Sequence, residues 1–303
     1  MEGINLKQKN IRISELQGRA DFADILTYGL NPLLLEASNE EPSQFEALFT
    51  RFELTRNNIP FPTFKGLVVG KIVEGQEIPF VSLGTGTQTI SAEDYGVRCG
   101  FTHQMIRDDL VDVIRFTTME LGRAHTRTKN RVAFAALEAG AANSAAASTT
   151  GKLSLKDIRL AKKKAAQFRE EGTNIPRPVY FTHLVMNPDQ QDDLVPATMD
   201  QTPPGIVMDP NTGDIKGVCG LQVITTAWIT PGVALLVKAK DKILYCVREE
   251  LRLDRTENFA TAAEEVRTLE AYTFAILYGD NIYKITGCGA TESAGGSGGG
   301  TGG

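Results

Sequence analysis

Histidine is the side chain that most readily transfers protons or binds zinc near neutral pH. There are three, His103, His125 and His183. No two of them are four residues apart, as in a zinc-binding helix, and none lies at a ligand spacing from a cysteine or a glutamate. We therefore predict structural histidines with hydrogen bonds inside the fold, and no catalytic or metal-binding role.

The glycine-rich segments do not form a nucleotide site. The run Gly84-Thr-Gly-Thr-Gln-Thr resembles half of a dinucleotide loop, but β-branched residues follow it where a phosphate-binding helix would have to begin. The sequence has no G-x-x-x-x-G-K-[ST] loop and no G-x-S-x-G turn. We predict that the chain is not an enzyme and has no cofactor; an α+β enzyme is the alternative from another functional class.

Two further features have a structural and a functional interpretation. Asp189, Asp192 and Asp193 could bind a hard cation, but their spacing also suits the positive end of a helix dipole, and we predict the helix-capping role. Trp228 precedes Ile229-Thr-Pro-Gly232, and we predict a core or corner anchor there in place of a ligand platform.

Composition indicates a folded protein without a strong charge bias. Of 303 residues, 42% are hydrophobic and 23% are charged, and the net charge is −5, which excludes both general disorder and a nucleic-acid clamp based on bulk charge. No apolar run approaches the length of a membrane span, and residues 1–5 do not resemble a signal peptide, so we predict no membrane partner and a cytoplasmic origin. The four cysteines have no C-x-x-C pair, and we predict reduced thiols at Cys99, Cys219, Cys246 and Cys288.

The first 31 residues read as a polar arm with one amphipathic helix. Ser14 is the expected cap and Gly29 the expected end, and a helical stripe lies between them at Leu16, Ala20, Ala23 and Leu26. We expect Asn31-Pro32 to break the chain direction. The alternation of large apolar and polar residues from Phe45 to Thr55 predicts a strand.

Residues 55–98 combine many glycines and prolines with β-forming residues, which excludes a helix of normal length. The pattern predicts an extended β-hairpin or long loop. Two interpretations stay open: an arm that packs on a neighbouring copy, and a small sheet folded onto its own chain.

An uninterrupted helical stripe follows from about Gln104 to Glu138, with Gly122 as its one weak position. A helix of this length must act as a spine. Its other face is charged, and it is either solvated or in contact with an adjacent subunit; the charged residues are Arg107, Asp108, Arg115, Glu120, Arg123, Arg127, Lys129 and Arg131.

In the second half, Ser154 and Asp157 form a capping box that opens a helix expected to end at Gly172. We expect surface loops at 140–151 and 196–210, and a short helix from Asn187 to Leu194. Buried or half-buried strands are predicted at 178–186, 221–226, 233–238, 243–253, 266–278 and 282–285. The Gly/Ser-rich end, 294–303, is either a native flexible tail or a remnant of engineering, and no element is predicted in it.

The order of these elements resembles one family. Glu74-Gly-Gln-Glu-Ile-Pro79, then the segment from Asp94 to Asp109 beginning Asp-Tyr-Gly-Val-Arg, and then a very long helix are similar to the tailed-phage major capsid proteins of the HK97-like fold. Val185-Met-Asn-Pro-Asp-Gln resembles the family's "MNP" strand end, and the segments 217–237 and 264–278 resemble its closing strands. The resemblance covers roughly residues 15 to 287, and its order and spacing are more specific than any one motif.

The resemblance implies an α+β, HK97-like capsid fold with an N-terminal arm, an extended β-hairpin E-loop, a long spine helix in a P-domain and a mixed α/β A-domain. The implied domains are the arm at 1–31, the start of the P-domain at 32–54, the E-loop at 55–98, the spine helix and its loop at 99–150, the A-domain at 151–262, closing P-domain strands at 263–288 and a flexible tail at 289–303.

It also implies a structural role: pentamers and hexamers of one chain form an icosahedral shell around double-stranded DNA in a virion. The expected partners are further copies of the chain, portal and scaffolding proteins, and packaged DNA bound without sequence specificity, with a decoration protein left open. We expect no scaffolding domain ahead of Met1. An encapsulin-like compartment shell that encloses cargo enzymes is the alternative, and the well-developed N-terminal arm favours the phage capsid.

The candidate contacts between subunits lie on the arm, the E-loop and the spine helix. They are Leu16, Leu26, Phe61, Phe64, Lys65, Lys71, Glu74, Glu77, Arg107, Arg115 and Arg123. Family members that crosslink join an E-loop lysine to an asparagine of a neighbour. Lys65 and Lys71 are available here, but no motif selects the asparagine, so this chemistry is not carried over.

Overall fold

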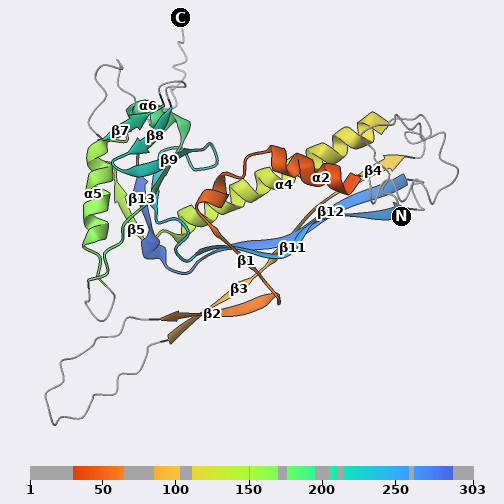
Figure 1. Cartoon of the computed structure of the whole chain (residues 1–303), viewed down its shortest axis with the longest axis horizontal. Coiled ribbons are helices and arrows are strands. Elements are labelled where there is room, and N and C mark those ends of the chain that lie inside the picture. The colour runs from red at the N-terminus through yellow and green to blue at the C-terminus, as the bar shows by residue number, and fades with distance from the viewer. Residues whose placement is uncertain are drawn as a thin grey trace, which may run out of the picture.

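The computed structural model describes residues 30–64, 85–102, 111–149, 151–169, 176–194, 205–209, 214–258 and 263–288. These residues form an elongated, two-part molecule: helices and a seven-stranded sheet lie at one end, and a long helix lies along a narrow four-stranded sheet towards the other (Figure 1). A two-stranded hairpin projects from the middle (Figure 1). Within the described residues no helix is long and apolar enough to span a membrane.

The four-stranded sheet is built around two long antiparallel strands. Its order is β1-β11-β12-β4, with β1 parallel to β11 and the other pairs antiparallel. The strands are β1 (Thr50–Glu53), β11 (Ile243–Asn258), β12 (Ala263–Ile276) and β4 (Glu93–Thr102). At about 3.3 Å per residue, the longer strands match the length of the helix that lies over them.

That helix is α4 (Val111–Gly140), the predicted spine. The predicted start near Gln104 falls outside the described residues, and the helix continues two residues past the predicted end at Glu138. At 1.5 Å per residue its 30 residues span about 45 Å.

A second helix, α2 (Leu30–Glu40), packs beside α4 and runs in the same direction. The Thr126 hydroxyl lies 2.9 Å from that of Ser38, and the Asn130 amide donates to the Pro42 carbonyl at 3.1 Å. The expected break at Asn31-Pro32 is wrong, because Pro32 stands in the first turn of α2, where a helix needs no backbone N–H. The predicted helix end at Gly29 and the whole stripe from Leu16 to Leu26 lie outside the described residues.

Gly122 is required by this helix crossing. A Cβ at position 122 would collide with the Leu34 carbonyl oxygen and lie 3.0 Å from the Ser38 backbone nitrogen. The weak helix former is therefore the residue that lets the two backbones approach each other.

The predicted strand 45–55 is only partly correct. Its first half is a 3-10 helix, η3 (Gln44–Ala47), and only β1 is extended. The turn buries Phe45 and Leu48 in one cluster with Phe134 and Leu137 of α4, so these large residues are spaced for a helical turn and do not alternate across a sheet.

The seven-stranded sheet has the order β5-β13-β10-β6-β9-β8-β7. Its strands are β5 (Asn143–Ala146), β13 (Ile282–Thr286), β10 (Val233–Val237), β6 (His183–Met186), β9 (Leu221–Thr225), β8 (Ile215–Val218) and β7 (Ile206–Met208). One face packs on η3 and the end of α4, and the other packs on α5 (Leu155–Ala166) and α6 (Pro188–Leu194).

Three predictions about this sheet need correction. The expected surface loops at 140–151 and 196–210 contain the strands β5 and β7, and β8 was not predicted. The strand expected at 178–186 is confined to β6. The small residues of β5 and the three residues of β7 show little periodicity in the sequence. β5 is held by pairing with the distant β13, and β7 by pairing with the adjacent β8.

The capping box of α5 is confirmed. The Ser154 hydroxyl accepts a bond from the Asp157 N–H, and the Asp157 carboxylate accepts from the Ser154 N–H at 3.2 Å. Burial opposes ionisation of Asp157, but hydrogen bonds from Ser154 and Ser148 hold its pKa below the ordinary value. The helix ends at Ala166, six residues before the predicted Gly172.

The predicted hairpin is present in β2 (Asn58–Phe64) and β3 (Thr85–Ser91), which pair antiparallel, while 65–84 lies outside the described residues. Its base rests on the four-stranded sheet. Ile90 is buried there with Leu54 and Cys246, and the Phe61 and Phe52 ring centroids are 5.2 Å apart. A short 3-10 helix, η5 (Gly279–Asn281), joins β12 to β13.

Candidate functional site

The two described histidines have hydrogen bonds inside the fold, as predicted; His103 lies outside the described residues. His125 is 4% exposed, and its Nε2 lies 2.8 Å from the Thr268 hydroxyl. His183 Nδ1 lies 2.8 Å from the Thr182 hydroxyl, and burial lowers the pKa of His183.

His125 belongs to a buried polar cluster between α4 and β12. Its Nδ1 is 3.5 Å from Oε2 of Glu270, which is 3% exposed, and Oε1 of the same carboxylate is 2.6 Å from Lys129 Nζ. The sequence did not indicate this cluster, because its members are scattered over two elements more than a hundred residues apart. It fastens the spine helix to the sheet and is closed to a substrate.

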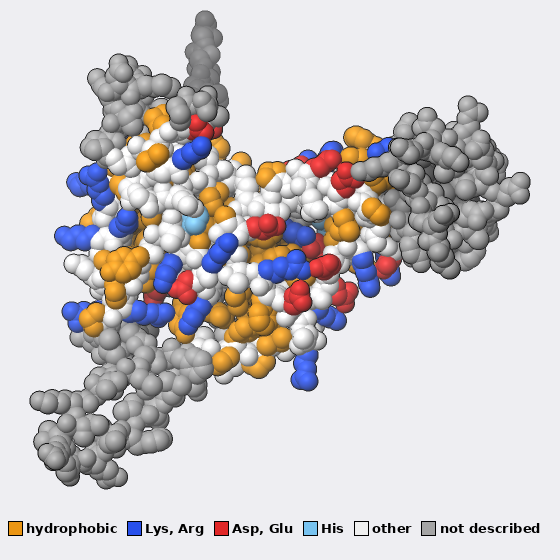
Figure 2. Space-filling view, viewed as in Figure 1, with side chains coloured by type: hydrophobic (Ala, Val, Ile, Leu, Met, Phe, Trp, Pro, Cys, Tyr) orange, Lys and Arg blue, Asp and Glu red, His pale blue; other side chains and the backbone are white. Residues whose placement is uncertain are grey.

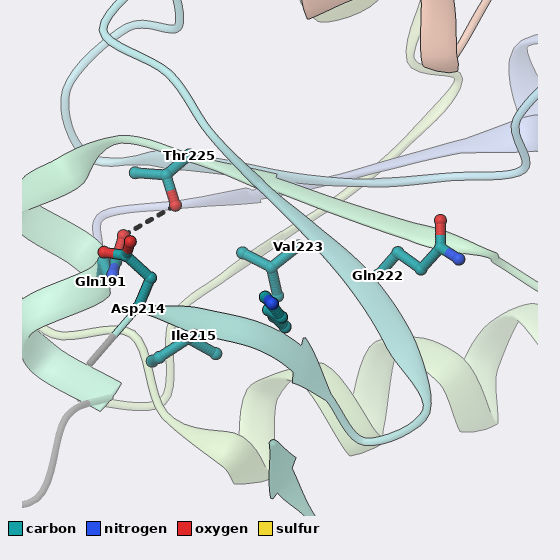
Figure 3. A pocket seen from close by; sticks show the side chains of 7 residues that line it. Gln191, Asp214, Ile215, Gln222, Val223 and Thr225 are labelled. Carbon is teal, nitrogen blue, oxygen red and sulfur yellow. Dashed lines mark hydrogen bonds between the residues drawn. The ribbon is translucent and has the colours of Figure 1, made fainter. Parts of the chain in front are cut away.

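The clearest surface depression lies beside β8, β9 and α6 (Figure 3). It is lined by Gln191, Asp214, Ile215, Lys216, Gln222, Val223 and Thr225. The Thr225 hydroxyl donates to Gln191 Oε1 at 2.7 Å, and the lining has no histidine or cysteine (Figure 3). Such a surface can bind polar groups but brings no nucleophile together with a base.

In α6 the first-turn N–H is capped by Asn187, and of the three aspartates Asp193 has a hydrogen bond inside the fold. Asp189 N–H bonds to the Asn187 side-chain oxygen at 3.2 Å, and Asp193 accepts the Leu153 N–H at 3.1 Å. No group of three potential ligands in the described part of the chain is placed to hold a metal ion. Trp228 stands at the turn between β9 and β10 and is 37% exposed, so it marks a corner and not the core.

Seven of the candidate contact residues fall outside the part that the structure describes: Leu16, Leu26, Lys65, Lys71, Glu74, Glu77 and Arg107. Phe64 ends β2. The Phe61 ring meets Phe52 of its own chain, so it anchors the hairpin base.

The two described spine arginines differ. Arg115 is exposed, whereas Arg123 reaches Glu40 at the end of α2 at 2.8 Å. Arg127 repeats this contact with Glu41 at 2.7 Å. Part of the charged face of α4 therefore ties α4 to α2, which is a third role beside solvation and subunit contact.

The structure also shows large apolar side chains on the surface, which the sequence pattern did not indicate. Phe116 on α4 is 66% exposed and Tyr180 is 69% exposed. Phe116 lies off the apolar stripe of the spine, and that position on a polar face is the signal that could have revealed it.

The comparisons with known proteins indicate one family of shell proteins. A family model described as phage capsid protein matches residues 85–285, and no curated protein matches the chain. The virus-like particle of Pyrococcus furiosus is 12% identical, with a TM-score of 0.57 over 86% of this chain and 98% of that chain. The capsid of Cyanophage P-SCSP1u is 13% identical, with a TM-score of 0.61 over 80% and 87%. The SrpI encapsulin of Synechococcus elongatus is 11% identical, with a TM-score of 0.57 over 83% and 89%.

At these identities the solved structures establish the architecture, which is the HK97-like fold expected from the sequence. The family model adds more, because it runs from β3 through the spine helix and both sheets to β13. Since it covers more than half of the sequence, the chain belongs to the phage capsid protein family.

Proposed function

We propose that the chain is a major capsid protein whose copies assemble as pentamers and hexamers into an icosahedral shell around double-stranded DNA. The observation that carries the proposal is the phage capsid family match across residues 85–285. The shell belongs to the virion, and its assembly takes place in the host cytoplasm.

The shape of the molecule supports assembly. The β2–β3 ribbon is held to the rest of the chain at its base, and a two-stranded ribbon is marginally stable by itself in water. A neighbouring copy would supply the missing surface for the hairpin, and exposed side chains such as Phe116 and Tyr180 are suited to burial in such contacts.

We propose that the contacts between subunits are made by the residues predicted from the sequence. These residues are Leu16, Leu26, Phe61, Phe64, Lys65, Lys71, Glu74, Glu77, Arg107, Arg115 and Arg123. Of these, Phe61 and Arg123 also have partners in their own chain, Phe52 and Glu40. The proposed domain limits are those given for the arm, E-loop, P-domain and A-domain. Portal and scaffolding proteins complete the assembly, and a decoration protein is an additional candidate partner.

An encapsulin-like compartment is the second candidate, favoured by one observation: the fold is shared with the SrpI encapsulin as well as with phage capsids. The two functions differ in cargo. The family model, which is that of phage capsids, favours DNA.

The test is nuclease protection combined with sedimentation. Particles purified from infected cells should sediment as shells and retain genome-length DNA after nuclease treatment, and disrupted particles should lose that DNA. Shells that contain proteins and no protected DNA would support the compartment instead. Protein that sediments only as small oligomers under all conditions would contradict both.

A further inference from the structure

The helix α5 and its flanks carry an unusual concentration of positive charge. Seven of the eight charged residues between 152 and 169 are basic, in a chain whose net charge is −5. The basic residues are Lys152, Lys156, Arg159, Lys162, Lys163, Lys164 and Arg169. Figure 2 shows Lys and Arg side chains along the edge of the molecule that α5 occupies.

The single acid in this segment cannot neutralise the lysines. Asp157 is 5% exposed, and its carboxylate is occupied by Ser148 and Ser154 in the capping box. Lys162 is also committed, since its Nζ donates to the Cys219 carbonyl at 2.7 Å and holds the flank of α5 to the β8–β9 turn.

Four lysines on the outer side of this segment have no such commitment. Lys152, Lys156, Lys163 and Lys164 are exposed, and none of their side chains forms an ion pair or hydrogen bond with a residue that the structure describes. In the four-stranded sheet and the spine the pattern is different. There, Arg123, Lys129 and Arg267 each bind a carboxylate of their own chain.

The inner face of α5 holds this charge array in place. Ile158 and Ala165 are completely buried in the core under the seven-stranded sheet, and Ala161 is 2% exposed. Positions 156, 160, 163 and 164 lie on the opposite, solvent side, because residues three, four and seven apart share a face of a helix. The helix is thus fixed to the core, and it presents Lys156, Lys163 and Lys164 to solvent without a partner among the described residues.

We propose that the outer face of α5, together with Lys152 just before the helix, is a contact surface for duplex DNA, on which Lys152, Lys156, Lys163 and Lys164 bind phosphates without recognising the base sequence. The inference rests on the proposed function, since the packaged genome supplies the phosphates. Lysine suits this contact because it is a compact charge on a long, adaptable stem. A row of lysines at helical spacing suits the regularly repeated phosphates of a duplex.

An acidic segment of a partner protein is the competing occupant. Leu160, which is 45% exposed among the lysines, would be the apolar centre of such a contact. The experiment therefore includes a polyglutamate probe beside the DNA.

The first measurement is the salt dependence of binding between the full-length subunit and a random-sequence duplex, by fluorescence anisotropy. The variant Lys156→Gln/Lys163→Gln/Lys164→Gln removes three phosphate contacts, so the slope of log K against log salt should become less steep by about 2 to 3. A matched control removes three cations that are paired within the chain, through Arg98→Gln/Lys216→Gln/Arg248→Gln. The control should keep the wild-type slope.

The second measurement uses wild-type particles and needs no variant. Lysine acetylation followed by mass spectrometry should show Lys156, Lys163 and Lys164 protected in DNA-filled particles and reactive in emptied ones. Equal reactivity in the two would overturn the proposal, and so would protection in both, which would indicate a contact between subunits.

The remaining outcomes are also decisive. Equal slopes for the wild type and the α5 variant, or binding to polyglutamate without binding to DNA, would overturn the DNA contact. Electron microscopy of the same samples separates the two levels: intact shells with no α5 effect leave the capsid function standing, whereas absence of shells contradicts the proposed function itself.

Discussion

Lys129 Nζ lies 2.6 Å from Glu270 Oε1, and this ion pair joins the middle of the spine helix to β12 where Glu270 is 3% exposed. The other carboxylate oxygen faces His125 Nδ1 at 3.5 Å. A carboxylate in such a place is stable only with its cation, because an isolated buried charge loses its hydration. The spine is thus fastened to the sheet by a polar contact as well as by apolar packing.

Replacing this carboxylate should weaken the fold considerably. Glu270→Gln leaves Lys129 without its counter-charge in a mostly buried site, and we expect a loss of about 3 kcal/mol in the free energy of unfolding. Denaturant unfolding of the unassembled subunit measures it. The control is Glu249→Gln, which removes pairs with Arg248 and Arg252 among side chains that are all about a third or more exposed, and it should cost about 1 kcal/mol or less. Equal losses of unfolding free energy in the two variants would show that burial does not increase the contribution of Glu270 to stability.

The close helix crossing predicts an unusual effect of alanine. Alanine is a better helix former than glycine by about 1 kcal/mol, yet Gly122→Ala should destabilise the subunit by about 1 to 3 kcal/mol because its Cβ collides with α2. Thermal unfolding provides the comparison. Gly100→Ala is the matched control, since a Cβ there meets only the Glu265 side chain at 3.9 Å and should be tolerated. A stabilised Gly122→Ala protein would mean that α2 does not lie this close.

The capping box makes one contribution to stability depend on pH. The pKa of Asp157 is lower in the folded state, so its contribution is complete above the unfolded pKa of about 3.9 and is lost as the pH falls through the folded value. Asp157→Asn should cost about 1 to 2 kcal/mol at pH 7, and the difference from wild type should shrink below about pH 4. Chemical unfolding across this pH range tests the sign. A difference that grows in acid would contradict it.

The hairpin base can be loosened without disturbing the long strands. Ile90 is 4% exposed, and Ile90→Ala should cost about 2 to 3 kcal/mol through the cavity it leaves. Hydrogen exchange should become faster in β2 and β3 while β11 and β12 stay protected. The control is Val97→Ala on β4, where the side chain is 44% exposed. It should leave both the free energy of unfolding and the exchange rates of β2 and β3 unchanged. Uniformly faster exchange over the whole subunit would mean that the hairpin unfolds only with the rest.

Thiol reactivity should divide the cysteines into two pairs. Burial raises the pKa of Cys246 and Cys288 to about 11, so almost no thiolate forms at pH 8. Cys99 and Cys219 are only half-buried. Alkylation of the native protein at pH 8 should modify Cys99 and Cys219 first. Rapid labelling of Cys246 would show that its strand pairing opens readily.

The sequence predicted the elements whose pattern is local. The spine helix has a long apolar stripe, α5 has a capping box, and β9, β10 and β13 are short apolar runs rich in β-branched residues, so each could be recognised without its neighbours. The strand β5 and the 3-10 helix η3 could not be recognised in this way. The small residues of β5 become a strand only by pairing with β13, nearly 140 positions later, and Phe45 is placed by contacts with Tyr245 and Phe274.

The candidate surfaces were predicted less completely. The hairpin was identified from glycine and proline density, but the intrachain pairs of Arg123 and Arg127 depend on how α2 crosses α4, which no local pattern encodes. The positive charge of α5 can be read from the sequence. Which of its lysines have a partner in their own chain depends on the folded structure. On α4 the apolar Ala135 is exposed, whereas the polar His125, Thr126 and Asn130 are buried.

The most direct test of the central claim is a cryo-electron microscopy reconstruction of particles formed by the full-length chain. We expect closed shells with icosahedral symmetry, built of five- and six-membered rings of one subunit, with the β2–β3 hairpin lying on a neighbouring copy. A protein that stays monomeric, or forms only open aggregates, at high concentration and with its assembly partners present would contradict it.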